Sequence, residues 1–187
     1  MVKELQLVQI TRELSGRWTI PILLSIDKSG GRFTPLKNKL EISPSRLSNN
    51  LKDMIDAGLI KNLSPYERNH PLLPEYLLTE KGYFLKEAAL VITSSEKQLN
   101  RGFLASKAWN WPILIALHYQ YKEFNSIRQL LQTATPRIVS TRLNELSNID
   151  LVETRPLPGL ATKQHYALSN HSDSILQTAT ADLVSLL

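Results

Sequence analysis

The sequence predicts a mainly α-helical fold with small β wings, in which one structural unit occurs twice. Residues 18–26 read WTIPILLSI and residues 109–117 read WNWPILIAL, so an apolar segment with tryptophan and proline recurs. Each copy is followed by apolar residues at helical spacing and then by short β-type runs. The 187 residues suffice for two domains of roughly 90 residues. We therefore expect a first domain over residues 1–92 and a second, more diverged domain over residues 93–187.

The repeat keeps its register beyond these two segments. Phe33 and Leu40 recur as Phe124 and Leu131 at the same offset as the tryptophans. A shift of one residue, typical of an insertion at a turn, brings further identities into line: Pro44 with Pro136, Ser48 with Ser140, Leu51 with Leu143 and Leu59 with Leu151. A structural repeat explains this register, although most of these residues are of core type and could reflect shared architecture without duplication.

Each copy is predicted to run helix, short strand, helix, helix, strand, strand. In the first copy, Thr19 can cap a helix that carries Pro21 in its first turn, where the missing N–H costs no hydrogen bond. A turn at residues 28–31 would end this helix. A short helix is then expected over residues 35–40.

The following helix is predicted over about residues 44–57, and its counterpart over about residues 136–148. Ser43–Pro44 and Thr135–Pro136 each supply an N-cap side chain and a proline at the first helical position. In the first copy, Gly58 suits a left-handed residue after the helix. The apolar stripe of that helix is Leu47, Leu51, Met54 and Ile55.

Two short strands are predicted after this helix, over residues 59–63 and 76–79. A polar loop that contains proline joins them, and such a hairpin beside a helical pair is a wing. The order of elements therefore predicts two tandem winged helix-turn-helix domains.

Composition excludes several classes of function. Hydrophobic residues at 42% and charged residues at 21% are typical of a folded globular protein. No apolar run reaches the ~20 residues of a membrane span, and the start does not resemble a signal peptide, so we expect a cytoplasmic protein without a membrane partner. The absence of cysteine excludes thiolate nucleophiles and zinc–thiolate sites, and the histidines lack metal-ligand spacing. We expect no metal and no cofactor, while the net charge of +5 favours a polyanionic partner.

The runs GRWTIPILLSI, RF, ISPSRLSNNLKDMIDAGLI and YLLTEKG resemble the HxlR family of winged-helix regulators, a branch of the MarR-like group. The resemblance covers about residues 14–90. A weaker resemblance covers about residues 105–187, where HYALSN replaces YLLTEKG and Asp150 replaces the C-cap glycine. The resemblance to the HxlR family implies a transcription regulator that binds double-stranded DNA and is not an enzyme. Several members carry a cysteine before the tryptophan, and this chain does not, so thiol sensing is not expected.

A recognition helix in the major groove would read DNA with its exposed face. In the first copy this face is predicted to consist of Ser45, Arg46, Ser48, Asn49, Asn50 and Lys52; in the second it consists of Arg137, Ser140, Thr141, Arg142 and Asn144. The family commonly places arginine at the position of Asn50, and the second copy keeps it as Arg142, so we favour Arg142 over Asn50. In the wings, Arg68, His70, Arg155, Lys163 and His165 could contact the backbone or the minor groove.

Three alternatives stay open from the sequence. Any single charged residue on these helices could be ordinary solvated surface. The tandem domains could instead form a protein–protein interaction module without specific DNA binding, since the fold permits it. Family members usually carry one domain and homodimerise through terminal helices, so this chain could act as a monomeric pseudo-dimer or as a homodimer. An unidentified small-molecule effector is also expected as a possible partner.

Overall fold

The computed structural model describes residues 2–27, 30–157 and 160–187, and for residues 157 and 160–163 it describes the backbone alone. The chain forms two compact units. We call Gly16–Leu90 the inserted unit. We call the other the split unit, because it combines the N-terminal segment up to Ser15 with Val91–Leu187.

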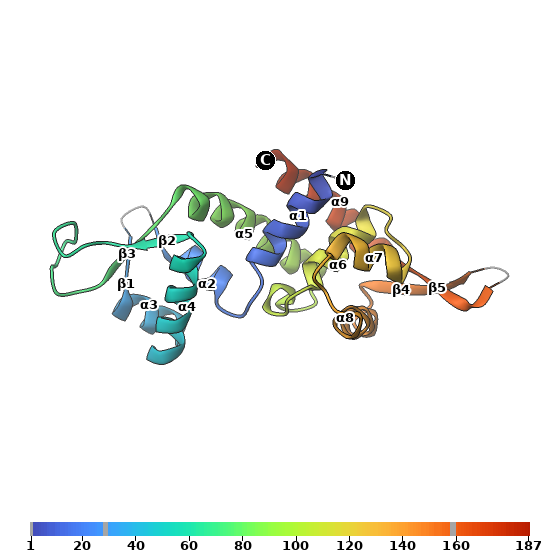
Figure 1. The fold of residues 1–187 in the computed structure, drawn as a ribbon, viewed down its shortest axis with the longest axis horizontal. Coiled ribbons are helices and arrows are strands. Elements are labelled where there is room, and N and C mark those ends of the chain that lie inside the picture. Colours follow the sequence, from blue (N-terminus) through green and yellow to red (C-terminus); the bar gives the residue numbers. More distant parts are fainter. Residues whose placement is uncertain (1, 28–29, 158–159) are drawn as a thin grey trace. The chain divides into compact units, whose positions relative to one another are not determined.

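The inserted unit contains a helix-turn-helix and a hairpin whose long loop extends beyond its sheet (Figure 1). Its sheet has the order β1-β3-β2 with antiparallel pairs, and Ile60 lies opposite Leu78. Buried Ile22, Leu23 and Leu36 join the helices into one core. Its elements are α2 (Thr19–Ser25), β1 (Gly31–Arg32), α3 (Phe33–Leu40), α4 (Pro44–Asp56), β2 (Ile60–Asn62), β3 (Glu75–Leu78) and the first part of α5 (Glu80–Leu99).

The split unit repeats this arrangement and adds a helix at each end of the chain (Figure 1). Strands β4 and β5 form a two-stranded antiparallel wing, in which Val152 lies opposite Leu168. Its elements are α1 (Val2–Glu13), the last part of α5, the 3-10 turn η1 (Leu104–Ser106), α6 (Asn110–His118), α7 (Phe124–Leu131), α8 (Pro136–Asn148), β4 (Val152–Leu157), β5 (Leu160–Leu168) and α9 (Asn170–Ser185).

Helix α6 is the centre of the split unit, because α1, α7, α8, α9 and β5 all pack against it. Ile113, Leu114 and Ile115 on successive faces are completely buried, as expected for a helix that is apolar all round. The indole N–H of Trp111 donates to Glu96 Oε1 over 2.8 Å, and the backbone N–H of Ala105 donates to the same oxygen over 2.7 Å. Burial raises the pKa of Glu96, and these two donors partly oppose that rise.

The mainly α-helical fold with small β wings is confirmed. Helices α4 and α8 begin at Pro44 and Pro136 as expected, and Gly58 has φ 71°. Asp150 takes the same left-handed conformation at φ 59°, where a side chain is less favourable than glycine. Among the described residues, no helix combines the length and apolarity needed to cross a membrane.

Three local expectations were wrong. The N-cap of α2 is Trp18, because Thr19 already occupies the first helical position. Ile55 lies at the surface of α4, since the buried stripe is carried by Leu47, Leu51 and Met54. The short strand expected before α7 is reduced to one bridge between Glu123 and His165, because the capping box of Glu123 starts the helix at the next residue.

The N-terminal helix α1 does not lie in the same compact unit as most of residues 1–92, the expected first domain. Helix α1 packs against α6, α7 and α9, with Leu7 completely buried. The sequence places α1 in the first domain, whereas its apolar face completes the core of the second.

Candidate nucleic-acid interface

Helix α4 presents a polar face opposite its buried stripe. Leu47, Leu51 and Met54 fix the helix on the inserted unit, and Pro44 starts it with no acidic residue in the first turn. The predicted DNA-contacting side chains left at the surface are Ser45, Arg46, Ser48, Asn49 and Lys52, and Asp53 and Asp56 are exposed toward the end of the helix. Asn50 is half-buried, and its Nδ2 donates to the backbone oxygen of Arg46 over 2.8 Å. The Nδ2 group of Asn50 is therefore used in part within its own helix.

Helix α8 repeats this geometry in the split unit. Val139, Leu143 and Leu146 are buried, and the hydroxyl of Thr135 accepts the N–H of Ile138 over 3.3 Å at the N-terminus. As in α4, no acidic residue lies in the first turn. The exposed side chains are Arg137, Ser140, Thr141 and Asn144.

Arg142 lies on α8 but is turned away from this exposed face. Its Nε donates to the backbone oxygen of Ala108 over 3.1 Å, and its Nη1 lies 2.5 Å from Glu145 Oε2. Lys107 Nζ approaches the same carboxylate oxygen to 3.1 Å. The hydrogen bond from Arg142 lowers the pKa of Glu145, with a smaller contribution in the same direction from Lys107. The guanidinium of Arg142 thus fastens α8 to the segment before α6.

Arg68 stabilises the first wing from within. Its Nε donates to Leu63 O over 2.7 Å, its Nη1 to Pro71 O over 3.2 Å and its Nη2 to Asn62 Oδ1 over 3.4 Å. Buried Glu75 accepts both the backbone and the side-chain N–H of Asn69. The loop is therefore held in shape by polar contacts on its inner side.

The same loop exposes three large apolar side chains. Tyr66 is 100% exposed, Leu72 is 83% exposed and Leu73 is 43% exposed. His70 is also exposed at this loop. The sequence pattern predicts a polar loop and misses these residues, although the runs Pro65–Tyr66 and Pro71–Leu73 carry the signal. Large exposed apolar side chains on a loop held by internal hydrogen bonds are typical of a contact surface.

The second wing pairs its described basic residues with acids. Arg155 Nη2 lies 2.8 Å from Glu153 Oε2, and His165 Nε2 lies 3.6 Å from Glu123 Oε1. Arg155 remains 63% exposed and can exchange its partner for another anion. Lys163 is part of β5, and its side chain lies outside the described residues.

The family model described as HxlR-like helix-turn-helix matches residues 13–100 and again residues 104–183. The chain belongs to the HxlR-like helix-turn-helix family. Its two HxlR-like domains confirm the tandem repeat and the two tandem winged helix-turn-helix domains. This family consists of DNA-binding regulators and is not an enzyme family. A search of the curated proteins and a search of the solved structures found no match.

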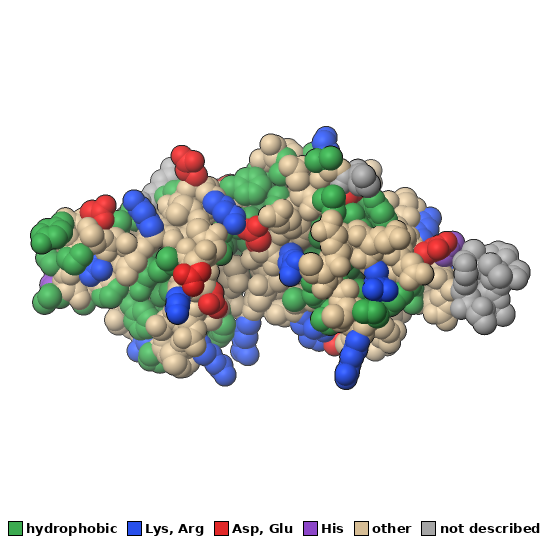
Figure 2. All heavy atoms as spheres, in the orientation of Figure 1, with side chains coloured by type: hydrophobic (Ala, Val, Ile, Leu, Met, Phe, Trp, Pro, Cys, Tyr) green, Lys and Arg blue, Asp and Glu red, His purple; other side chains and the backbone are tan. Residues whose placement is uncertain are grey.

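The two domains differ in how many of their predicted DNA-contacting residues have an exposed, unbonded side chain. The faces of α4 and α8 gather most of them, and Figure 2 shows Lys and Arg side chains projecting from the surface of each unit. Within the described parts of the chain, the side chains of Arg46, Lys52 and Arg137 make no hydrogen bond or ion pair. Asn50, Arg68 and Arg142 are instead held by protein partners. Among the residues described, no group of three His, Asp or Glu side chains could hold a metal ion.

Proposed function

We propose that this chain is a sequence-specific regulator that inserts α4 and α8 into the major groove of double-stranded DNA. One observation carries this proposal. Two helices in one chain each have a buried apolar stripe, an N-terminal turn free of acidic residues and an exposed face of Arg, Asn, Ser or Thr. A helix N-terminus attracts phosphate, and these side-chain types bind base edges and phosphates.

The exposed residues divide into two reading sets. On α4, the residues proposed to contact DNA are Arg46, Asn49 and Lys52. On α8, they are Arg137, Thr141 and Asn144. Arg pairs with guanine and Asn with adenine. Ser45, Ser48 and Ser140 then contact phosphates. Asn50 and Arg142 are left out of these sets, because Asn50 Nδ2 and Arg142 Nε already have protein partners, and Arg142 positions α8 against the segment before α6.

The wings have unequal roles in this proposal. Arg155, His165 and Lys163 of the second wing contact the DNA backbone, with Arg155 exchanging Glu153 for a phosphate. In the first wing His70 is exposed, whereas Arg68 shapes the loop that carries it.

Salt dependence tests the proposal. If about five to nine phosphates are neutralised, the log–log slope of affinity against salt should be roughly minus four to minus eight. Fluorescence anisotropy with a labelled duplex measures this slope for the chain and for Lys52→Ala, which should reduce it by about one if Lys52 meets one phosphate. Ile55→Ala on the same helix is the control, since this side chain carries no charge. A slope near zero would contradict the proposal.

The first wing favours a second candidate function, a protein–protein interaction module. Tyr66 and Leu72 offer apolar contact area without a nearby free cation on the loop. Tyr66→Ala together with Leu72→Ser separates the two functions. If α4 and α8 bind DNA as proposed, this pair leaves the salt slope unchanged. A chain that shows no DNA affinity at low salt would leave the interaction module as the better account.

A further inference from the structure

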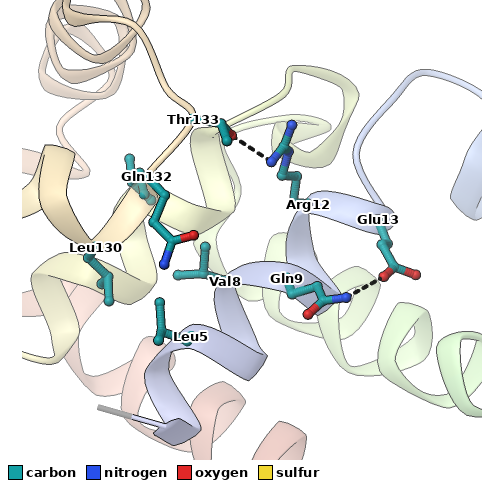
Figure 3. Close-up of a pocket in the computed structure, with 9 residues that line it drawn as sticks. Leu5, Val8, Gln9, Arg12, Glu13, Leu130, Gln132 and Thr133 are labelled. Carbon is teal, nitrogen blue, oxygen red and sulfur yellow. Dashed lines mark hydrogen bonds between the residues drawn. The ribbon is translucent and has the colours of Figure 1, made fainter.

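The split unit contains a groove of about 570 Å³ between α1 and the end of α7 (Figure 3). Leu5 and Val8 of α1 and Leu130 of α7 form an apolar floor. Arg12, Gln132 and Thr133 are among the polar residues of its rim. This volume lies within the roughly 300–1,000 Å³ of small-molecule sites, and the lining is mixed, with four apolar and five polar side chains.

Arg12 supplies a positioned cation at the rim. Its Nη1 donates to Thr133 Oγ1 over 2.7 Å, and its guanidinium lies 4.6 Å from the centre of the buried Trp109 ring. Stacking and one hydrogen bond hold the planar group in place. The guanidinium has five N–H donors, so donors remain for a ligand.

Gln132 extends over the apolar floor. It is the residue after α7, with φ 54° and ψ −64°, a backbone conformation that side chains rarely adopt. Figure 3 shows its amide between Leu130 and Val8. The carboxylate of Glu13 lies to the side, where it accepts the amide of Gln9 over 3.0 Å. Gln132 also lines a neighbouring hollow of about 490 Å³, to which Arg128 contributes a second guanidinium.

We propose that this groove binds an amphipathic organic anion. The apolar body of the ligand packs on Leu5, Val8 and Leu130, and its acidic group accepts hydrogen bonds from Arg12. The amide of Gln132 covers the ligand. A cationic amphiphile is disfavoured, because its ammonium group would face the guanidinium of Arg12.

The position of the groove couples it to the proposed DNA contact. Gln132 and Thr133 belong to the turn of the helix-turn-helix, and Thr135 caps the first turn of α8. A ligand that bridges α1 and this turn changes the freedom of α8, so ligand and DNA alter each other's affinity by the same factor. This coupling rests on the proposed function, whereas the binding of the ligand does not.

Displacement of a fluorescent anion tests the site on the full chain. The probe is 8-anilinonaphthalene-1-sulfonate, and the competitors are octanoate, octylamine and octanol at equal concentration near neutral pH. We expect saturable probe binding that octanoate displaces at least about tenfold more effectively than octylamine, as expected for a charge-assisted hydrogen bond. Equal displacement by octanoate and octylamine would overturn the proposal, as would the absence of saturable binding. This comparison uses the unaltered chain, so it does not depend on the folding of any variant.

Matched arginine variants locate the site. Arg12→Gln should weaken probe binding about tenfold, and Arg12→Lys should restore most of it because the charge returns. Arg17→Gln is the control, since Arg17 also stacks on a tryptophan, Trp18, at 5.3 Å but belongs to the inserted unit. Equal losses in Arg12→Gln and Arg17→Gln would overturn the assignment to this groove.

A DNA titration with octanoate tests the coupling. Saturating octanoate should change duplex affinity at least about threefold in the unaltered chain and not in Arg12→Gln. If octanoate binds but leaves DNA affinity unchanged, the coupling is overturned and the site stands. If no DNA binds at any salt concentration, the proposed function fails, and the displacement experiment still decides the site.

Discussion

Arg137 and Arg142 lie on the same helix and have opposite surroundings. Arg137 is exposed, whereas the side chain of Arg142 is only 22% exposed and is bonded to Glu145 and to the backbone of Ala108. The sequence predicted the helix and both arginines, and it favoured Arg142 over Asn50 as a DNA contact. The Arg142 side chain turns toward Ala108, which lies 34 residues earlier in the chain. The local sequence pattern of α8 therefore could not show this orientation.

Alanine substitutions of these two arginines should therefore separate binding from stability. Arg137→Ala should weaken DNA binding by about 1 to 3 kcal/mol if Arg137 contacts a base, and leave the free energy of unfolding nearly unchanged. Arg142→Ala should lower the free energy of unfolding by about 1 to 2 kcal/mol through lost hydrogen bonds. Duplex titration and urea unfolding of both variants measure these effects. A stability loss in Arg137→Ala equal to that in Arg142→Ala would contradict the assignment.

Glu96 should make the stability of the split unit depend on pH. Burial raises its folded pKa above the ordinary 4.5, so the folded chain holds the proton more tightly than the unfolded chain. The contribution of Glu96 is greatest below pH 4.5 and is lost as pH rises through the folded pKa. Urea unfolding from about pH 4.5 to neutral should therefore show this decline in the unaltered chain and a weaker one in Glu96→Gln. Parallel pH profiles would contradict this role.

Helix α1 acts as part of the split unit although it begins the chain. The sequence predicted the helices and wings of both copies, because apolar spacing and the Ser–Pro and Thr–Pro starts are local signals. It could not assign α1, since its buried face fits α6, α7 and α9, which follow much later. Nor could the sequence show that only an isolated bridge forms before α7, because the start of α7 depends on the cap at Glu123.

Weakening α1 should destabilise the split unit and spare the inserted unit. Leu7→Ala removes a completely buried side chain and should cost about 2 to 5 kcal/mol. Gln6→Ala, at an exposed position of the same helix, is the control. Hydrogen exchange resolved by segment reports each unit separately. Equal loss of protection in Gly16–Leu90 and Val91–Leu187 would contradict the grouping of α1 with the split unit.

At the scale of the whole molecule, the proposed function gives one chain two unlike recognition helices, α4 and α8. The proposed pseudo-dimer uses both helices of one chain on one DNA site. Sedimentation on a bound duplex should then show one chain of 21.2 kDa per site. Two chains per site would favour a homodimer with four recognition helices.

The difference between α4 and α8 also predicts the symmetry of the DNA sequence that the chain binds. Identical recognition helices select a palindrome with half-sites about 34 Å apart. Here α4 offers Arg46 and Asn49, whereas α8 offers Arg137, Thr141 and Asn144. Arg46 and Asn49 are two and five residues after Pro44, whereas Arg137 and Asn144 are one and eight residues after Pro136. The two half-sites should therefore differ in the positions of the guanine bound by Arg and the adenine bound by Asn.

Selection of bound duplexes from random DNA tests the central claim most directly, because every possible site competes in one pool. We expect enrichment of an imperfect inverted repeat with one preferred orientation. Arg46→Ala should relax one half-site, and Arg137→Ala should relax the other. A perfect palindrome would contradict the pseudo-dimer, and a pool without any enriched sequence would contradict specific DNA recognition by this chain.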